Sequence, residues 1–329
     1  MKTAAAAELV QRAASILAAG GVVGLPTETV YGLAADGTNP LAVREIFELK
    51  GRPHAHPVIL HLGRRDWLST YALDPPQEAL DLAERFWPGP LTLVVRRNPK
   101  RVPDEVTGGQ PTVALRMPDH PLALAVITAL GRPVAAPSAN RFGRVSPTCV
   151  EHVRQDLGNK LPLILDGGAC QVGVESTILD LSRAQPYLLR PGKATRQQIA
   201  EVLGRDVLDA DGRSGPAPGT LASHYAPRAT VEIAADPAAV GKRIDALSSQ
   251  GERVGLIGFE GQAPARGVHA QVTLGASPED WARRVYAALR ELDQQGCSWI
   301  VSVAPVGQDL AEAVRDRLTR AAAPRSAAD

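Results

Sequence analysis

The sequence predicts an α/β protein in which a mixed sheet is followed by a smaller, Rossmann-like parallel α/β domain. Over residues 1–207, strand-like and helix-like hydrophobic patterns mingle without strict alternation, whereas over residues 230–329 they alternate regularly. Residues 208–229 between them are rich in Gly, Pro and Ser and have no hydrophobic period, which is typical of a linker. A length of 329 residues agrees with two domains of roughly 150 residues each.

The first domain begins with a helix over residues 4–18, which ends at Gly20 and Gly21. Asn39 followed by Pro40 predicts the cap and the first residue of a helix whose body is Leu41 to Lys50. The spacing of apolar residues predicts the other elements. Helices are expected at 77–86, 121–130 and 195–203, and strands at 22–25, 57–62, 91–96, 112–115, 133–136, 161–165, 176–181 and 187–190.

The second domain repeats a simple strand–helix order. Strands are expected at 230–233, 254–259 and 299–303, and helices at 237–247, 278–292 and 310–320. Regular alternation of this kind implies a small parallel sheet, because parallel strands are joined by right-handed crossover connections.

The composition narrows the classes of function. With 44% hydrophobic and 22% charged residues, the chain is packed rather than disordered or fibrous. A formal net charge of +1 gives no overall basic field, so any phosphate chemistry must come from a few placed cations. No apolar stretch approaches the ~20 residues that span a membrane. The three cysteines, without a Cys-x-x-Cys pair, suit a reducing compartment, and we therefore expect a cytoplasmic protein without a membrane partner.

Several familiar motifs do not occur in the sequence. It contains no Walker-type G-x-x-x-x-G-K-[ST] loop, no G-x-G-x-x-G after a strand, no H-E-x-x-H and no G-x-S-x-G elbow. The usual nucleotide-loop, zinc-protease and serine-hydrolase interpretations are thereby excluded. Candidate chemistry must instead be sought in the polar residues that flank predicted strands.

Lys50 and Arg52 lie just past a helix end, in a loop that Pro53 and Pro57 stiffen. An arginine can hold a phosphate by two parallel hydrogen bonds while a lysine supplies a compact charge, so the pair could clamp a phosphate. Equally, Lys50 could complement the helix dipole and Arg52 could be solvated. The neighbouring histidines lack Cys or acidic partners at metal-ligand spacing, which disfavours a metal site: His54, His56 and His61.

Two polar segments follow apolar strands. Thr27, Glu28 and Thr29 come after the strand 22–25, at the kind of strand end where open α/β sheets place ligands. The alternative is a capped turn, in which these side chains bond nearby backbone N–H groups. The segment Pro137-Ser138-Ala139-Asn140 likewise follows a strand, and could bind an oxyanion or a base edge or serve as a turn.

Arg116 and Arg190 each end an apolar strand. A buried guanidinium without a partner is costly, so each needs an anion, either a protein carboxylate or a ligand. Glu175-Ser176-Thr177 adds two hydroxyls at the start of another strand. Together these residues favour chemistry by positioning and charge neutralisation, such as attack on the α-phosphate of a nucleotide. A Mg²⁺ ion would then be held mainly by the phosphates.

The motifs also resemble a known family. GGVVGLPTETVYGLAAD, KGRPHAHPVILH, LALAVITALGRPVAAPSAN, GVESTILDL and LRPG, in this order, are similar to the YrdC-type threonylcarbamoyl-adenylate synthases from about residue 10 to about residue 205. The segment APGTLASHYAP resembles the tether of the long form of this family, which carries an additional C-terminal α/β domain. The resemblance implies an open, twisted, mixed α/β sheet, YrdC-like, with a concave positive cavity.

The resemblance implies an adenylate-forming nucleotidyltransferase. L-threonine, bicarbonate (or CO₂) and ATP, with Mg²⁺, would give threonylcarbamoyl-AMP and pyrophosphate. A downstream tRNA threonylcarbamoyl-transferase complex would then modify the adenosine next to the anticodon of tRNA. The chain could itself contact tRNA.

The resemblance also implies roles for individual residues. The positions that match ATP-binding residues are Lys50, Arg52, His56, Thr112, Ser138, Asn140, Ser146, Arg190 and Tyr225. Those that match threonine-binding residues are Thr29, His61, Arg116, Ala136 through its backbone, and Ser176. Lys50 and Arg52 would be the catalytic cations, Arg116 would pair with the amino acid's carboxylate, and Tyr225 would cover the nucleotide. No protein ligand to a metal is implied.

Two other functions are compatible with the sequence. One is a non-catalytic module that binds double-stranded RNA or tRNA, which the weak net charge and the 4% aromatic content disfavour. The other is a carbamoyl-transfer domain of hydrogenase maturation, which would stand beside acylphosphatase and zinc-finger segments that this sequence lacks. Formation of a labelled adenylate from ATP, threonine and labelled bicarbonate would distinguish the synthase from these two alternatives.

Overall fold

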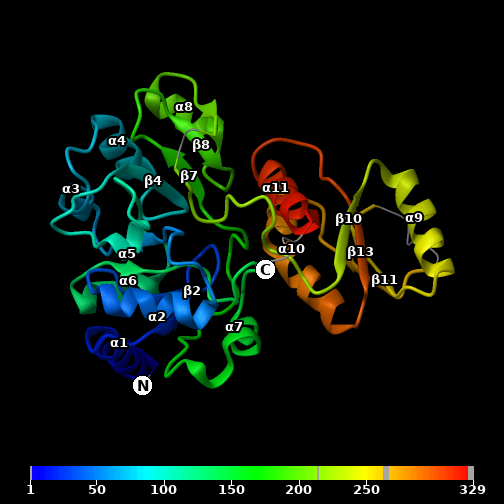
Figure 1. The fold of residues 1–329 in the computed structure, drawn as a ribbon, viewed down its shortest axis with the longest axis horizontal. Coiled ribbons are helices and arrows are strands. Elements are labelled where there is room, and N and C mark those ends of the chain that lie inside the picture. Colours follow the sequence, from blue (N-terminus) through cyan, green and yellow to red (C-terminus); the bar gives the residue numbers. More distant parts are fainter. Residues whose placement is uncertain (1, 213–214, 262–266, 325–329) are drawn as a thin grey trace. The chain divides into compact units, whose positions relative to one another are not determined.

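The computed structural model describes residues 2–212, 215–261 and 267–324, which divide into two compact units (Figure 1). The first unit comprises Met1–Phe142, Pro147–Gln171 and Glu175–Thr220. The second comprises Gly143–Ser146, Val172–Val174 and Leu221–Asp329. We predicted a linker over residues 208–229, and the two units divide that range between Thr220 and Leu221.

The first unit is built on a sheet in which parallel and antiparallel strand pairs are mixed, as the sequence predicted (Figure 1). The strands pair in the order β1-β2-β6-β3-β5-β4-β7-β8-β9. Their bounds are β1 Val23–Leu25, β2 Gly32–Asp36, β3 Ile59–His61, β4 Leu91–Arg96, β5 Thr112–Arg116, β6 Val134–Ala135, β7 Thr177–Asp180, β8 Tyr187–Arg190 and β9 Leu208–Asp209.

The helices of this unit begin and end largely where local signals place them. They are α1 Lys2–Ala18, α2 Pro40–Lys50, α3 Leu68–Tyr71, α4 Gln77–Phe86, α5 Asp104–Thr107, α6 Pro121–Leu130, α7 Val150–Leu157 and α8 Arg196–Leu203, with short 3₁₀ turns at Arg65–Trp67 and Gly158–Lys160. The Asn39 side chain caps α2 by accepting from the Leu41 N–H at 3.0 Å. Among the described residues of the whole chain, no helix is long and apolar enough to cross a membrane.

The two faces of the central strands differ. Successive side chains of a strand point to opposite faces, and Leu60, Leu93, Leu115 and Leu179 all join the main apolar core. Their neighbours on the other face form a smaller apolar patch: Ile59, Val94, Ala114 and Ile178. Ala217, from the predicted tether, packs on this patch. The irregular segment that contains Ala217 therefore covers part of this patch.

The second unit confirms the predicted parallel sheet. Its strands are β10 Thr230–Ala234, β11 Val254–Gly258, β12 Ala270–Thr273 and β13 Trp299–Val303, and its helices are α9 Pro237–Ser249, α10 Pro278–Gln294 and α11 Leu310–Ala322. The strands pair in the order β10-β13-β11-β12, and every pair is parallel.

Some predicted elements are wrong. Residues 161–165 do not form a strand: Ile164 makes one isolated bridge to Gly24, and Pro162 has no N–H to extend a ladder. The start of the predicted linker is the edge strand β9, which pairs with β8. The polar segment after β1 is the tip of a hairpin, because β2 returns antiparallel to β1. Five further elements had not been predicted from the sequence: β2, α3, α5, α7 and β12.

Candidate active site

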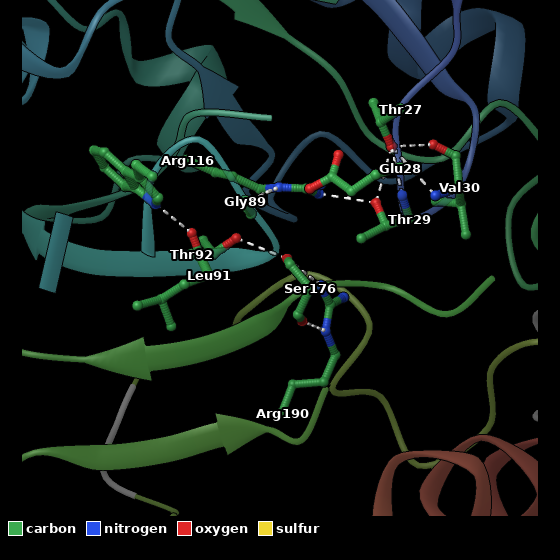
Figure 2. Close-up of polar contacts among 11 residues, drawn as sticks. Thr27, Glu28, Thr29, Val30, Gly89, Leu91, Thr92, Arg116, Ser176 and Arg190 are labelled. Atoms are coloured by element: carbon green, nitrogen blue, oxygen red, sulfur yellow. Dashed lines mark hydrogen bonds and ion pairs between the residues drawn. The ribbon is translucent and has the colours of Figure 1, made fainter. Parts of the chain in front are cut away.

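The hairpin tip between β1 and β2 combines turn bonding with side chains that reach further. The Thr27 hydroxyl donates to the Val30 carbonyl at 2.6 Å and accepts from the Val30 N–H at 3.2 Å, so Thr27 does serve as a turn residue. Glu28 and Thr29, in contrast, bond to Arg116 from β5 (Figure 2). The turn interpretation thus holds for Thr27 and fails for its two neighbours.

Arg116 is buried at the end of β5 and makes three kinds of bond. Its Nη2 donates to Oε1 of Glu28 at 2.6 Å, its Nη1 to the Thr29 hydroxyl at 3.0 Å, and its Nε to the Gly89 carbonyl at 3.3 Å. The anion that this guanidinium was expected to need is therefore a protein carboxylate, Glu28. From the sequence, Glu28 was only an acid in a polar segment, because a pairing across 88 positions leaves no local signal.

His61 lies beside Arg116, since β3 and β5 pair in parallel with these two residues in register. Its ring is buried, and Nδ1 has no hydrogen-bond partner among the described residues. Burial, and secondarily the charge of Arg116, lowers the pKa of His61 to about 3. The ring is therefore neutral near pH 7 and has an unsatisfied nitrogen.

A second buried polar group joins β4, β7 and β8. The Ser176 hydroxyl lies 2.7 Å from the Thr92 hydroxyl and accepts from Nη2 of Arg190 at 3.2 Å (Figure 2). Arg190 also donates through Nε to the Ser176 carbonyl at 3.0 Å. Thr92 did not stand out in the sequence, although it is the one polar residue in the apolar run LTLVV of β4.

The Lys50 side chain reaches from the end of α2 to the loop after β6. Its buried ammonium donates to the Ser138 carbonyl at 2.5 Å and to the Asn140 carbonyl at 2.6 Å. The Phe142 N–H donates back to the Lys50 carbonyl at 2.9 Å. Burial, and next the nearby charge of Arg52, lowers the pKa of Lys50. Lys50 thus ties the KGRP and PSAN segments together instead of lying over its own helix end.

Arg52 follows a sharp turn. Gly51 takes the left-handed conformation (φ +66°) that ends α2, which a side chain would oppose. The Arg52 Nη2 then donates to the Pro57 carbonyl at 2.7 Å, and the guanidinium lies 5.6 Å from the Phe142 ring centroid. His56 meets the same ring edge-on, and burial together with the Arg52 charge lowers the pKa of His56. Arg52 is buried, which rules out the solvated alternative.

A cavity of about 200 Å³ opens on the second face of the sheet. Thr112 and Ala114 of β5, Pro57 and Leu189 line it, together with the segment Gly215, Pro216, Ala217 and Pro218. Arg190 Nη1 donates to the Pro218 carbonyl at 2.8 Å, so the start of the tether is bonded to a candidate site residue. Of the predicted site residues, Thr112 lines this cavity beside the start of the tether, whereas the four cations do not line it: Lys50, Arg52, Arg116 and Arg190.

Strand alternation places several of the predicted residues on this same face. In β5, Thr112, Ala114 and Arg116 share a side, and the register carries this side to His61 in β3. Arg190 pairs with Ile178, whose side chain belongs to the patch on the second face. The Ala136 N–H donates to the Ile59 carbonyl at 3.0 Å, which sets the backbone of Ala136 beside β3.

Two predicted nucleotide-lining residues belong to the second unit. Ser146 lies in Gly143–Ser146, and Tyr225 follows Leu221. Tyr225 has a positive φ of 63° and is buried against Tyr286, with ring centroids 5.4 Å apart. Within the described parts of the chain, no group of three or more His, Cys, Asp and Glu side chains could hold a metal ion. The roles expected of Ser146 and Tyr225 stay predictions.

Two family models together match most of the chain. Residues 15–192 match the model described as telomere recombination, and residues 194–323 match the model described as threonylcarbamoyl-AMP synthase, C-terminal domain. The chain belongs to the threonylcarbamoyl-AMP synthase family. The threonylcarbamoyl-AMP synthase of Pyrococcus abyssi is 41% identical over 323 residues, which cover 95% of this chain and 94% of the relative. That of Bacillus subtilis is 40% identical over 323 residues, covering 96% and 93%.

The fold of this family member agrees with a solved structure. The crystal structure of P. abyssi Sua5 complexed with L-threonine has a TM-score of 0.90 with this chain at 39% identity, covering 95% of this chain and 94% of that one. The mixed sheet with a second, parallel sheet is thus the fold of that protein as well. Family membership makes the chain an enzyme, an adenylate-forming transferase that makes threonylcarbamoyl-AMP, and not a non-catalytic RNA-binding module.

Proposed function

We propose that the first unit binds ATP and L-threonine side by side on the second face of its sheet. The observation that carries this proposal is the burial of four cationic side chains within that unit, next to buried hydroxyls: Lys50, Arg52, Arg116 and Arg190. Buried cations that adjoin one another raise the free energy of the empty site, and a polyanion relieves that cost. Charge arranged in this way suits a reaction in which phosphate charge must be neutralised.

The ATP phosphates are assigned to Lys50 and Arg52, which the KGRP turn places close enough for the charge of one to lower the pKa of the other. A guanidinium and an ammonium then hold the leaving pyrophosphate, and Mg²⁺ enters with ATP on the phosphate oxygens. The remaining positions of the first unit assigned to the nucleotide are His56, Thr112, Ser138, Asn140 and Arg190.

L-threonine is assigned to the neighbourhood of Arg116. Part of the donor fork of Arg116 is not used by Glu28, Thr29 and Gly89, and it receives the amino acid's carboxylate. The other groups assigned to threonine are Thr29, His61, Ser176 and the backbone of Ala136. The neutral ring of His61 offers a hydrogen bond there without adding charge.

The chemistry divides into two bond-forming steps. The amine of threonine attacks the carbon of CO₂, a proton leaves the nitrogen, and a carbamate results. A carbamate oxygen then attacks the α-phosphorus of ATP, and pyrophosphate leaves. With bicarbonate as the carbon source, the overall products are threonylcarbamoyl-AMP, pyrophosphate and water. Lys50 and Arg52 stabilise the charge that develops on the phosphates, and a closed site protects the product from hydrolysis.

We further propose that the product passes to a tRNA threonylcarbamoyl-transferase complex in the cytoplasm, with or without direct contact between this chain and tRNA. A mixed anhydride of a carbamate and a phosphate is readily hydrolysed. A reaction class that consumes it by attack of an amine must therefore follow closely.

The test is a reaction of the full chain with MgATP, L-threonine and labelled bicarbonate. We expect a labelled adenylate whose formation requires both ATP and threonine and is accompanied by an equal amount of pyrophosphate. ATP turnover that does not depend on threonine, or salt-sensitive binding of tRNA without any labelled adenylate, would contradict the proposed function.

A further inference from the structure

Glu28 is a buried carboxylate with one oxygen satisfied and one not. Its side chain is 6% exposed, and Oε1 accepts from Nη2 of Arg116 at 2.6 Å. Oε2 is buried and has no hydrogen-bond partner among the described residues. A buried anionic oxygen without a donor costs free energy, so this arrangement needs an explanation.

The role of counter-ion to Arg116 does not explain the second oxygen. Some arginine–carboxylate pairs of this chain use both oxygens of the carboxylate, and others use one oxygen of an exposed carboxylate such as that of Asp209, whose side chain is 87% exposed. Arg183 donates to Oδ1 of Asp211 at 2.8 Å and to Oδ2 at 2.9 Å, and Arg64 binds both oxygens of Asp66. Such two-bond pairing is the preferred geometry of a guanidinium and a carboxylate. Glu28 instead gives Arg116 one oxygen and keeps the other for a different donor.

The residues around Glu28 do not supply that donor. The Thr27 hydroxyl donates to the Val30 carbonyl, so at 2.9 Å it accepts from the Thr29 hydroxyl, which itself accepts from Arg116 (Figure 2). Burial, and secondarily the negative charge of Glu28, raises the pKa of the Cys170 thiol, which therefore stays protonated as a weak donor only. An incoming cationic donor is thus the natural partner of Oε2.

We propose that Oε2 of Glu28 binds the α-ammonium group of the amino acid substrate and selects it over carboxylic acids without an amine. The inference rests on the proposed function, in which Arg116 receives the carboxylate of threonine. The ammonium and carboxylate of an α-amino acid are adjacent, so a ligand whose carboxylate meets Arg116 brings its ammonium next to the carboxylate already bound to Arg116. Positive and negative charges then alternate around the site, and each has an opposite neighbour.

This arrangement makes Glu28 a specificity-determining residue. A ligand without the amine leaves Oε2 buried and unsatisfied, and a site built around a polar group rejects an analogue that leaves that group unpaired. A ligand with the amine removes the penalty and gains a charge-assisted hydrogen bond.

The experiment compares two ligands that differ only in the amine, L-threonine and (R)-3-hydroxybutanoate. Their dissociation constants are measured by calorimetry on the full chain, in the presence of a non-hydrolysable ATP analogue. The wild-type chain is expected to bind threonine at least about 100-fold more tightly. In Glu28→Gln the ratio of the two constants is expected to fall at least about 10-fold, because the charge-assisted bond is lost from the threonine complex alone. Asp66→Asn, which removes a carboxylate from an exposed pair in the same unit, serves as the control and should leave the ratio unchanged.

A merely structural role gives a different result. If Glu28 only holds Arg116 in place, Glu28→Gln weakens both ligands equally, and the unchanged ratio overturns the proposal. If Glu28→Gln does not fold, Glu28→Asp is measured instead, because aspartate keeps the charge but has a shorter side chain. A lowered ratio of the two dissociation constants then supports the proposal, and an unchanged ratio overturns it. A wild-type chain that makes no labelled adenylate refutes the proposed function itself, whereas normal product with an unchanged ratio refutes only the role of Glu28.

Discussion

The two units of this chain bury polar side chains in different ways. In the first unit, buried ionisable groups gather where strands or helices end and irregular segments meet: Glu28, Lys50, Arg52, His61, Arg116 and Arg190. In the second unit, the buried Ser302 of β13 bonds to the Ile257 carbonyl of β11 at 3.0 Å, inside a regular ladder. Its buried Arg317 pairs with the adjacent Asp316 at 2.6 Å and lies 5.5 Å from the Tyr225 ring.

This difference between the units indicates which buried polar groups serve stability and which serve ligand binding. Ser302 and Arg317 of the second unit are each matched by a neighbouring group of that unit. In the first unit Lys50 and Arg52 adjoin each other, His61 adjoins Arg116, and an oxygen of Glu28 and a nitrogen of His61 lack partners among the described residues. Such an arrangement makes sense if ligands supply the missing charges. Substitutions of these first-unit residues should therefore change turnover, and substitutions of Ser302 or Arg243 in the second unit should change only stability.

The largest effect is expected for Arg52→Ala. Removing the guanidinium takes away stabilisation of the leaving pyrophosphate, so threonine-dependent pyrophosphate release should fall by about 10³-fold or more. Arg243→Ala is the matched control in the second unit, where Arg243 pairs with Glu232 at 2.8 Å. It should retain near-normal release. Release by Arg52→Ala within a few-fold of the wild type would contradict the assignment.

Arg116→Lys is the next strongest substitution. Lysine keeps the charge but loses the planar fork that binds Glu28, Thr29 and a carboxylate together. The KM for threonine should rise by about 100-fold, while the KM for ATP should change by less than about 3-fold. Initial-rate kinetics with each substrate varied in turn measure the split. An equal rise in the KM for threonine and the KM for ATP would contradict the assignment of Arg116 to the threonine subsite.

His61 gives a pH-dependent prediction. Its pKa is lowered to about 3 in the folded chain, below the ordinary value of 6.5, so between these values the unfolded chain binds one more proton than the folded chain. Stability is therefore lost as the pH falls through this window, by up to about 1.4 kcal/mol per pH unit from this group. The free energy of unfolding of His61→Gln, measured by chemical denaturation, should therefore fall less between pH 6 and pH 4 than that of the wild type. Identical slopes for wild type and variant would refute this.

The smallest effects come from a matched pair of buried hydroxyls. Thr92→Val removes the hydrogen bond to Ser176 and should raise the KM for threonine about 5-fold, the equivalent of about 1 kcal/mol. Ser302→Ala should lower the stability of the second unit by about 1 kcal/mol and leave both KM values unchanged. A change of KM in Ser302→Ala, or none in Thr92→Val, would break the contrast between the units.

The elements that could be predicted from the sequence are those with local causes. The Asn39-Pro40 cap fixes the start of α2, and the apolar runs of β4 and β8 were placed to the residue. The parallel order of the second unit followed from regular strand–helix alternation. The burial expected of Arg116 and its need for an anion followed from the apolar strand that it ends.

The rest depends on contacts between distant residues. Nothing near Glu28 indicates Arg116, and nothing near Lys50 indicates the carbonyls of Ser138 and Asn140. The strand expected at 161–165 fails although its residues are apolar, because Pro162 and an isolated bridge leave no ladder to join. The family resemblance identified the candidate residues. The strand register of the structure shows that several of them, including Thr112, Arg116 and His61, lie on one face of the sheet.

The most direct measurement is a crystal structure of the full chain with L-threonine and a non-hydrolysable ATP analogue. The phosphates are predicted within hydrogen-bond distance of Lys50 and Arg52, and the threonine carboxylate at Arg116 on the second face of the first sheet. Phosphates bound away from Lys50 and Arg52, or an amino acid that does not touch Arg116, would contradict the account.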